Sequence, residues 1–93
     1  MASPIDERLN ALGISLPEAA APAANYVPFA VDGNLIFTSG QLPLRQGSLV
    51  AEGIIGKDLD VEAGREAAKW CAINILSQAK AALGDLEKIE RVV

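Results

Sequence analysis

The fold of this chain is organised around one stretch, Gly33-Asn34-Leu35-Ile36-Phe37-Thr38-Ser39-Gly40-Gln41-Leu42-Pro43. It begins at a tight turn, Asp32-Gly33, continues as a short apolar run and ends in small and polar residues. The apolar run, Leu35–Phe37, is too short for an independent helix and predicts a strand that is buried on at least one face. Pro43 has no backbone N–H, so we expect strand pairing to weaken there.

A second β-favouring run lies just before this stretch. Val27–Val31 is rich in branched and aromatic residues, and Pro28 within it indicates an edge strand because proline cannot donate to a ladder. An Asp-Gly pair between two such runs is a strong hairpin signal. We therefore expect Val27–Val31 to pair antiparallel with Asn34–Ser39, and the latter strand to lie centrally in a larger sheet.

One long helix is expected from Val61 to Leu83. Asp60 is a suitable N-cap, and Gly84 can end the helix in a left-handed conformation. At 3.6 residues per turn, its small and apolar residues fall on one arc, which we expect to lie against the sheet. We interpret Cys71, on that arc, as a buried and unreactive thiol. The arc contains Val61, Gly64, Ala68, Cys71, Ala72, Ile75, Leu76, Ala79, Ala82 and Leu83.

Trp70 and Ile73 fall on the opposite, polar side of this helix and need a cover. Either a short N-terminal helix or a partner subunit could supply it. Ser3-Pro4 is a good helix start, and Gly13 can close the helix. We favour this helix as the cover because it also gives a short helix a place to dock. Its apolar stripe would consist of Ile5, Leu9 and Leu12.

The remaining elements complete an α+β pattern. Gln46-Gly47 predicts a turn before a short third strand, Ser48–Val50, and Lys88–Val93 reads as a final strand. The order strand, strand, short strand, helix, strand implies a crossover and a mixed sheet with the helix on one face. We expect one domain over residues 1–93, with residues 1–16 as an N-terminal helical extension and Leu16–Ala24 as an extended connector. The connector is either a plain linker or one wall of a ligand site. The apolar pattern continues to the last residue, so we interpret the chain as the N-terminal part of a longer protein.

Composition limits the available chemistry. The 93 residues carry a net charge of −4 and show no basic stripe, which disfavours nucleic-acid binding driven by bulk charge. Histidine is absent and Cys71 is the only cysteine, which excludes Ser-His and Cys-His pairs and argues against a typical zinc site. The chain has neither a signal-like start nor an apolar run of membrane-spanning length, so we expect a cytoplasmic protein without membrane partners.

Several landmarks occur together: Ala21–Ala24, Tyr26-Val27, the Gly33–Pro43 stretch, and Ala82–Leu86 after the long helix. In this order the chain resembles the RidA family, also called the YjgF or endoribonuclease L-PSP family, and most closely its longer bacterial branch with an extra N-terminal helix. The resemblance covers nearly the whole chain. It implies a chorismate-mutase-like α+β fold and a homotrimer with clefts between subunits.

The resemblance also implies an activity. Family members with a full site are enamine/imine deaminases that hydrolyse 2-imino or 2-enamino acids, such as 2-aminoacrylate, to 2-keto acids and ammonia. They use no metal or organic cofactor. By position, Tyr26 and Ser39 match catalytic residues of the cleft, and with Gly40 they would bind a small carboxylate or imine ligand.

The chain departs from the family pattern in two ways. The family's carboxylate-binding arginine, and a carboxylate that positions water, belong to a C-terminal half, and Arg45, Arg65 and Arg91 do not match that arginine. Asn25 and Pro28-Phe29 replace the usual neighbours of the tyrosine, which implies a bulkier and less polar wall. The 93 residues alone are therefore expected to be inactive.

Three functions remain open from the sequence. The first is the deaminase, and the second is a non-catalytic trimeric protein that binds a small metabolite in the same cleft. The third, the endoribonuclease or translation-inhibitor activity of the family, is the weakest because the chain is acidic and lacks a basic or aromatic platform. Both site residues also have a purely structural alternative. Tyr26 can be an ordinary edge or core residue, and Ser39 can cap a turn.

Overall fold

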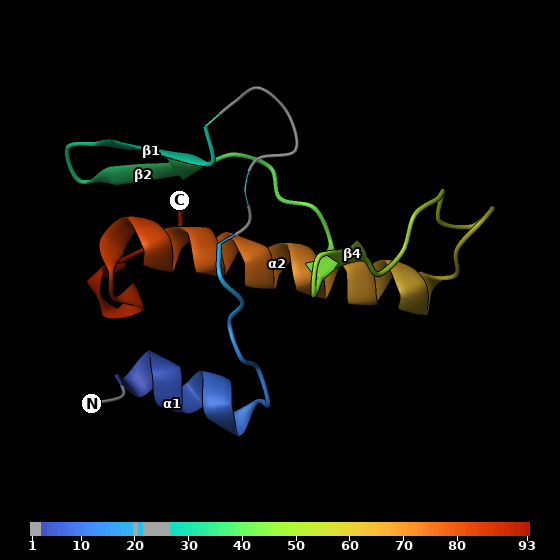
Figure 1. The fold of residues 1–93 in the computed structure, drawn as a ribbon, viewed down its shortest axis with the longest axis horizontal. Coiled ribbons are helices and arrows are strands. Elements are labelled where there is room, and N and C mark those ends of the chain that lie inside the picture. Colours follow the sequence, from blue (N-terminus) through green and yellow to red (C-terminus); the bar gives the residue numbers. More distant parts are fainter. Residues whose placement is uncertain (1–2, 20, 22–26) are drawn as a thin grey trace.

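The computed structural model describes residues 3–19, 21 and 27–93 (Figure 1). Helix α2 lies between the β1–β2 hairpin on one side and helix α1 on the other, which gives the predicted α+β class. Within the described ranges, no helix combines the length and apolar character needed to cross a membrane. The elements are α1 (Pro4–Ala11), β1 (Phe29–Asp32), β2 (Leu35–Thr38), β3 (Leu44–Arg45), β4 (Ser48–Leu49), α2 (Val61–Leu83) and the 3-10 turn η1 (Leu86–Lys88).

Strands β1 and β2 form the predicted hairpin. Phe29–Asp32 pairs antiparallel with Leu35–Thr38, and the turn holds Gly33 at φ 60°, a conformation that glycine adopts without a steric cost. Side chains alternate between the two faces of the pair. Ile36 is half-buried on the face toward α2, whereas Phe37 is exposed on the other face.

Strands β3 and β4 form a second, shorter hairpin. The predicted turn is confirmed, with Gln46 at φ 53° and Gly47 at φ 82°, as a type I′ turn requires. Its strands pair Leu44–Arg45 with Ser48–Leu49. The expected mixed sheet with a central β2 is not what the described residues form, because β2 pairs only with β1 and the second hairpin stands apart. Pro43, which lacks an N–H, separates the two pairs.

Both helices begin and end where the sequence predicts. Ser3 caps α1 in a capping box, with its hydroxyl accepting from the Asp6 N–H and the Asp6 carboxylate accepting from the Ser3 N–H. Asp60 caps α2 by accepting from the Ala63 N–H at 2.8 Å. Gly84, at φ 81°, ends α2 and donates its N–H to the Lys80 carbonyl.

The buried side of α2 differs from the prediction. Its buried residues are Ile73, Asn74, Ser77, Gln78 and Ala79, and of these only Ala79 belongs to the predicted arc. Cys71 is half-buried, and the exposed members of the arc are Val61, Ala68, Ala72 and Ile75. The sides of an alanine-rich helix differ little in hydrophobicity, so the segments that pack against it determine which side is buried. Here the loop after β2 offers polar partners to Asn74 and Gln78.

The predicted cover of Trp70 is wrong. Helix α1 packs against η1, where the Ile5 N–H donates to Glu87 Oε1 at 2.9 Å, and its Leu12 remains largely exposed. The Arg45 guanidinium of β3 lies over the Trp70 ring instead, 5.5 Å from the centroid. A cation over an aromatic face is attracted by the ring quadrupole, so β3 meets this part of α2 in place of α1.

The predicted strand over Lys88–Val93 does not form. The chain makes the η1 turn, in which Leu86 is almost fully buried, and then runs without a strand to Val93. Strand conformation depends on a partner ladder, and no strand in the described part of the chain pairs with this segment. The connector prediction holds for residues 16–19 and 21, which form neither helix nor strand, and its other positions lie outside the described residues.

Candidate functional site

The predicted site lies where β2 ends. Ser39 is half-buried, and both its N–H (3.0 Å) and its hydroxyl (3.1 Å) donate to the Pro28 carbonyl. These bonds extend the hairpin by one rung beyond β1. They direct the hydroxyl proton toward the neighbouring strand, and no donor among the described residues occupies the lone pairs of the oxygen, which can accept a hydrogen bond. The hydroxyl proton of Ser39 thus makes a local backbone contact, as the turn-capping alternative expects. The hydroxyl oxygen can still accept a hydrogen bond from a ligand.

Gly40, the next residue, is exposed. A Cβ atom built on it would meet no heavy atom of the described residues within 4 Å, and it is not among the glycines with positive φ. Neither the backbone conformation nor a neighbour in the described part of the chain therefore requires glycine at this position. What the missing side chain provides is open space above the backbone, which a ligand or another chain can approach.

Two buried polar side chains of α2 hold the strand end in place. The Asn74 side-chain nitrogen lies 3.1 Å from the Leu42 carbonyl, 3.0 Å from the Leu44 carbonyl and 2.8 Å from the Trp70 carbonyl. Asn74 is 4% exposed. One amide thus joins the loop after β2 to the helix, in a setting where an unpaired polar group would be costly.

Gln78 repeats this connection one turn later. Its Nε2 lies 3.4 Å from Gln41 Oε1, and Gln41 Nε2 lies 3.4 Å from the Ser39 carbonyl. The chain of amides therefore leads from the buried side of α2 to Ser39. Sequence reasoning missed Asn74 and Gln78 because it sought an apolar arc. Their four-residue spacing on one side of the helix was the only signal present.

The structure brings Ser39 and Gly40 together but does not test Tyr26, which lies outside the described residues. The arginines show other partners: Arg45 lies over Trp70, and Arg65 pairs with Glu62 at 3.4 Å. Across the described ranges, no three His, Cys, Asp or Glu side chains gather as a metal site would require.

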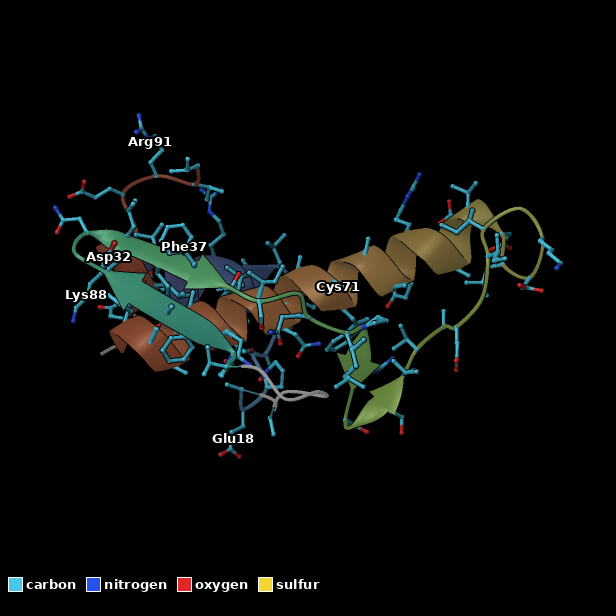
Figure 2. All side chains as sticks on the ribbon, turned by 90° about the horizontal axis from the view of Figure 1, so that it is seen from above. Glu18, Asp32, Phe37, Cys71, Lys88 and Arg91 are labelled. Carbon is cyan, nitrogen blue, oxygen red and sulfur yellow. The ribbon has the colours of Figure 1, made fainter. Side chains whose placement is uncertain are left out.

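A shallow hollow of about 340 Å³ lies away from this strand end, between the connector and the last turns of α2. Glu18 at its rim points away from the body of the molecule (Figure 2). Of the predicted site residues that the structure describes, neither Ser39 nor Gly40 lines the hollow, so we do not assign the predicted ligand to it. It is lined by Leu16, Pro17, Glu18, Ala19, Ser77, Lys80, Ala81 and Gly84.

Comparison with known proteins identifies the family. Residues 6–93 match the family model described as "YjgF/chorismate_mutase-like, putative endoribonuclease". The chain belongs to this family. The match covers both hairpins, α2 and the strand end with Ser39 and Gly40, so the YjgF/chorismate-mutase-like fold and the resemblance seen in the sequence are confirmed.

Three relatives extend the comparison. Protein TCP17 of Trypanosoma cruzi is 47% identical over 85 residues, which are 91% of this chain and 53% of the relative. The crystal structure of the Agrobacterium tumefaciens protein Atu1372, of unknown function, is 51% identical with a TM-score of 0.82 and covers 94% of this chain and 53% of its own. A putative endoribonuclease from Shewanella oneidensis is 39% identical with a TM-score of 0.89, covering 94% of this chain and 58% of its own. The chain thus spans about half the length of these relatives.

Proposed function

We propose that the protein to which this chain contributes is an enamine/imine deaminase that hydrolyses reactive 2-imino or 2-enamino acids to 2-keto acids and ammonia. The observation that carries the proposal is the strand end of a YjgF-family fold, where Ser39 keeps acceptor capacity beside the open backbone of Gly40. A small planar substrate could approach this backbone without meeting a side chain at position 40.

The chemistry needs positioned polar groups rather than a strong nucleophile from the protein. An enamine first takes up a proton at carbon to become the iminium ion. Water then adds to the iminium carbon and passes a proton to the nitrogen, and the resulting carbinolamine releases ammonia while its hydroxyl loses the last proton to leave the 2-keto acid. We assign orientation of the water or the iminium N–H to the Ser39 hydroxyl oxygen, with Tyr26 as the second catalytic group and Gly40 supplying open backbone.

We further propose that the subunits form a homotrimer in the cytoplasm, with the ligand held between subunits. Support comes from the outer face of the β1–β2 hairpin, where Leu35 and Phe37 are more than half exposed although both are large and apolar. Such a face is suited to burial against another copy. The carboxylate-binding arginine would come from sequence outside these 93 residues.

The test measures ammonia release from 2-aminoacrylate that a pyridoxal-phosphate enzyme generates in the cuvette. It compares the 93-residue chain with a chimera that joins this chain to the part of the Agrobacterium protein that it does not span. We expect turnover by the chimera and none by the chain alone. Ser39→Ala should lower the chimera's turnover by about tenfold or more, as expected for a lost positioning group. The matched control is Ser48→Ala, at an exposed serine in β4, which should leave turnover unchanged.

The assay also separates the alternatives. A chimera that accelerates the hydrolysis of no imino acid in a panel contradicts the deaminase. If small 2-keto acids then raise its melting temperature without product formation, the cleft is a binding site only. The endoribonuclease reading predicts cleavage of single-stranded RNA that Ser39→Ala abolishes, and the net charge of −4 makes this the less favoured outcome.

A further inference from the structure

The backbone N–H of Gly40 is a donor that no acceptor among the described residues takes up. Gly40 is exposed, so a ligand can reach this N–H. The peptide bond between Ser39 and Gly40 is trans and planar, which means that its C=O and its N–H point in opposite directions. The group that holds the Ser39 carbonyl therefore sets the direction in which the Gly40 N–H is presented.

Gln41 holds that carbonyl. Its Nε2 donates to the Ser39 carbonyl oxygen at 3.4 Å from a half-buried position. A backbone carbonyl can only accept, so the Gln41 amide must turn its NH2 group toward Ser39 and its oxygen away. This orientation is favoured further if the Gln41 oxygen finds a donor of its own.

Gln78 of α2 is that donor. Its Nε2 lies 3.4 Å from Gln41 Oε1, and the residue is only 1% exposed. The row of groups is therefore directional: Gln78 donates, Gln41 accepts and donates, and the Ser39 carbonyl accepts. It leads from a buried side chain of the helix to the peptide at the strand end.

The two contacts are better suited to orientation than to stability. Both are longer than the ~3.2 Å that usually limits N–H···O hydrogen bonds, so each contributes little to the free energy of folding. Asn74 already joins the carbonyls of Leu42 and Leu44 to α2 at 3.1 and 3.0 Å. The loop is thus attached without the two glutamines, and what they add is the direction of the Ser39–Gly40 peptide.

We propose that Gln41 and Gln78 are positioning residues of the deaminase site, with Gln78 orienting the Gln41 amide and Gln41 fixing the Ser39–Gly40 peptide. Both act through that peptide rather than on the reacting atoms. The Gly40 N–H and the Ser39 hydroxyl oxygen then keep a constant direction relative to each other while imine and water bind, as an oriented hydrolysis requires. The inference rests on the function proposed above for Ser39 and Gly40.

Kinetics of the chimera with the Agrobacterium segment test the proposal. Gln41→Met keeps the length of the side chain but removes the amide, and Gln78→Met does the same on the helix. Each should lower kcat by about tenfold with a smaller change in KM, because displaced groups slow the reaction more than they weaken binding. The double variant should lose no more than the larger single loss, since the residues act in one row. The matched control is Gln46→Met, at an exposed glutamine in the turn between β3 and β4, which should keep the wild-type kcat.

The melting temperature separates positioning from a structural role. Gln41→Met should lower it by less than Asn74→Ala, which removes the amide that attaches the loop. A wild-type kcat in Gln41→Met overturns the proposal. So does a loss of kcat that comes with melting as low as that of Asn74→Ala, and so does a double variant whose loss is the product of the two single losses.

Nuclear magnetic resonance gives a readout that does not depend on activity. In 1H–15N spectra of the chimera, Gln78→Met should shift the resonances of the Gly40 N–H and of the Gln41 side-chain NH2, although it lies far from both in sequence. Gln46→Met should leave them in place. If the wild-type chimera has no turnover, the deaminase is wrong and these shifts alone decide whether the glutamines position the peptide. A Gly40 resonance that Gln78→Met does not move overturns the proposal.

Discussion

Replacing Asn74 by alanine tests whether the buried amide holds the strand end on α2. The substitution removes contacts to the carbonyls of Leu42, Leu44 and Trp70. The Leu42 carbonyl keeps the Leu44 N–H at 2.8 Å, so not every acceptor loses its partner. With a net contribution of about 0.5–1.5 kcal/mol per hydrogen bond, we expect a loss of about 2 kcal/mol in the free energy of unfolding. For a chain of this size that corresponds to a melting temperature lower by roughly 8–16 °C.

The assay is urea denaturation followed by circular dichroism, with Ser77→Ala as the control. Ser77 is equally buried, but its hydroxyl donates to the Ile73 carbonyl within the same helix and ties no loop to it. Its loss should cost less than about 1 kcal/mol, since alanine is also the better helix former. If Asn74→Ala costs no more than Ser77→Ala, the amide does not connect the strand end to the helix, and our account of the site's support is wrong.

Three further predictions concern other parts of the chain. The hydrogen bonds that Asp6 accepts from Ser3, from its backbone N–H first, lower the pKa of Asp6 from its ordinary value of 3.8. A carboxyl whose pKa is lower in the folded state stabilises the fold above the unfolded pKa, and this stability is lost as the pH falls. Asp6→Asn should therefore make the melting temperature depend less on pH below about pH 4, and parallel pH profiles of the two proteins would contradict this. Gly53 has φ 145°, and a Cβ there would lie 2.7 Å from Asp58 Cβ; Gly53→Ala should cost roughly 1–3 kcal/mol in urea denaturation, and a cost near zero would show that the loop adapts. Arg45→Ala removes the cation over Trp70, the only tryptophan, and should shift its fluorescence to longer wavelength with a loss of about 0.5–1 kcal/mol; an unchanged spectrum refutes the contact.

Local signals predicted the elements well. The Asp-Gly pair before β2 and the Gln-Gly pair before β4 both form turns, because the turn geometry is set by the residues within it. The caps Asp60 and Gly84 likewise fix the ends of α2. At the site, the sequence placed Ser39 and Gly40 at a strand end, as the structure does, and their role in catalysis remains a prediction.

Contacts between distant parts of the chain determine the features that local sequence signals did not predict. The apolar arc of α2 was an incorrect guide because loop carbonyls satisfy Asn74, which makes burial of a polar side possible. Trp70 is met by Arg45, a residue 25 positions away that carries no local signal for the contact. The segment 88–93 has strand composition but no strand beside it in the described ranges, so its propensity is not realised.

The docking of α1 has a consequence for how the chain opens. The hydrogen bond from the Ile5 N–H to Glu87 joins α1 to η1 and is exposed to solvent. The polar contacts between α1 and the rest of the fold include this exposed hydrogen bond and the Asp6–Lys80 ion pair at 3.8 Å. Exposed ion pairs of this kind contribute about 0–1 kcal/mol to stability. Helix α1 should therefore detach and re-dock while α2 stays intact, so that its amide hydrogens exchange with solvent orders of magnitude faster than those of α2. The N-terminal helix should then behave as a separate cooperative unit, which can be released without unfolding the strand end.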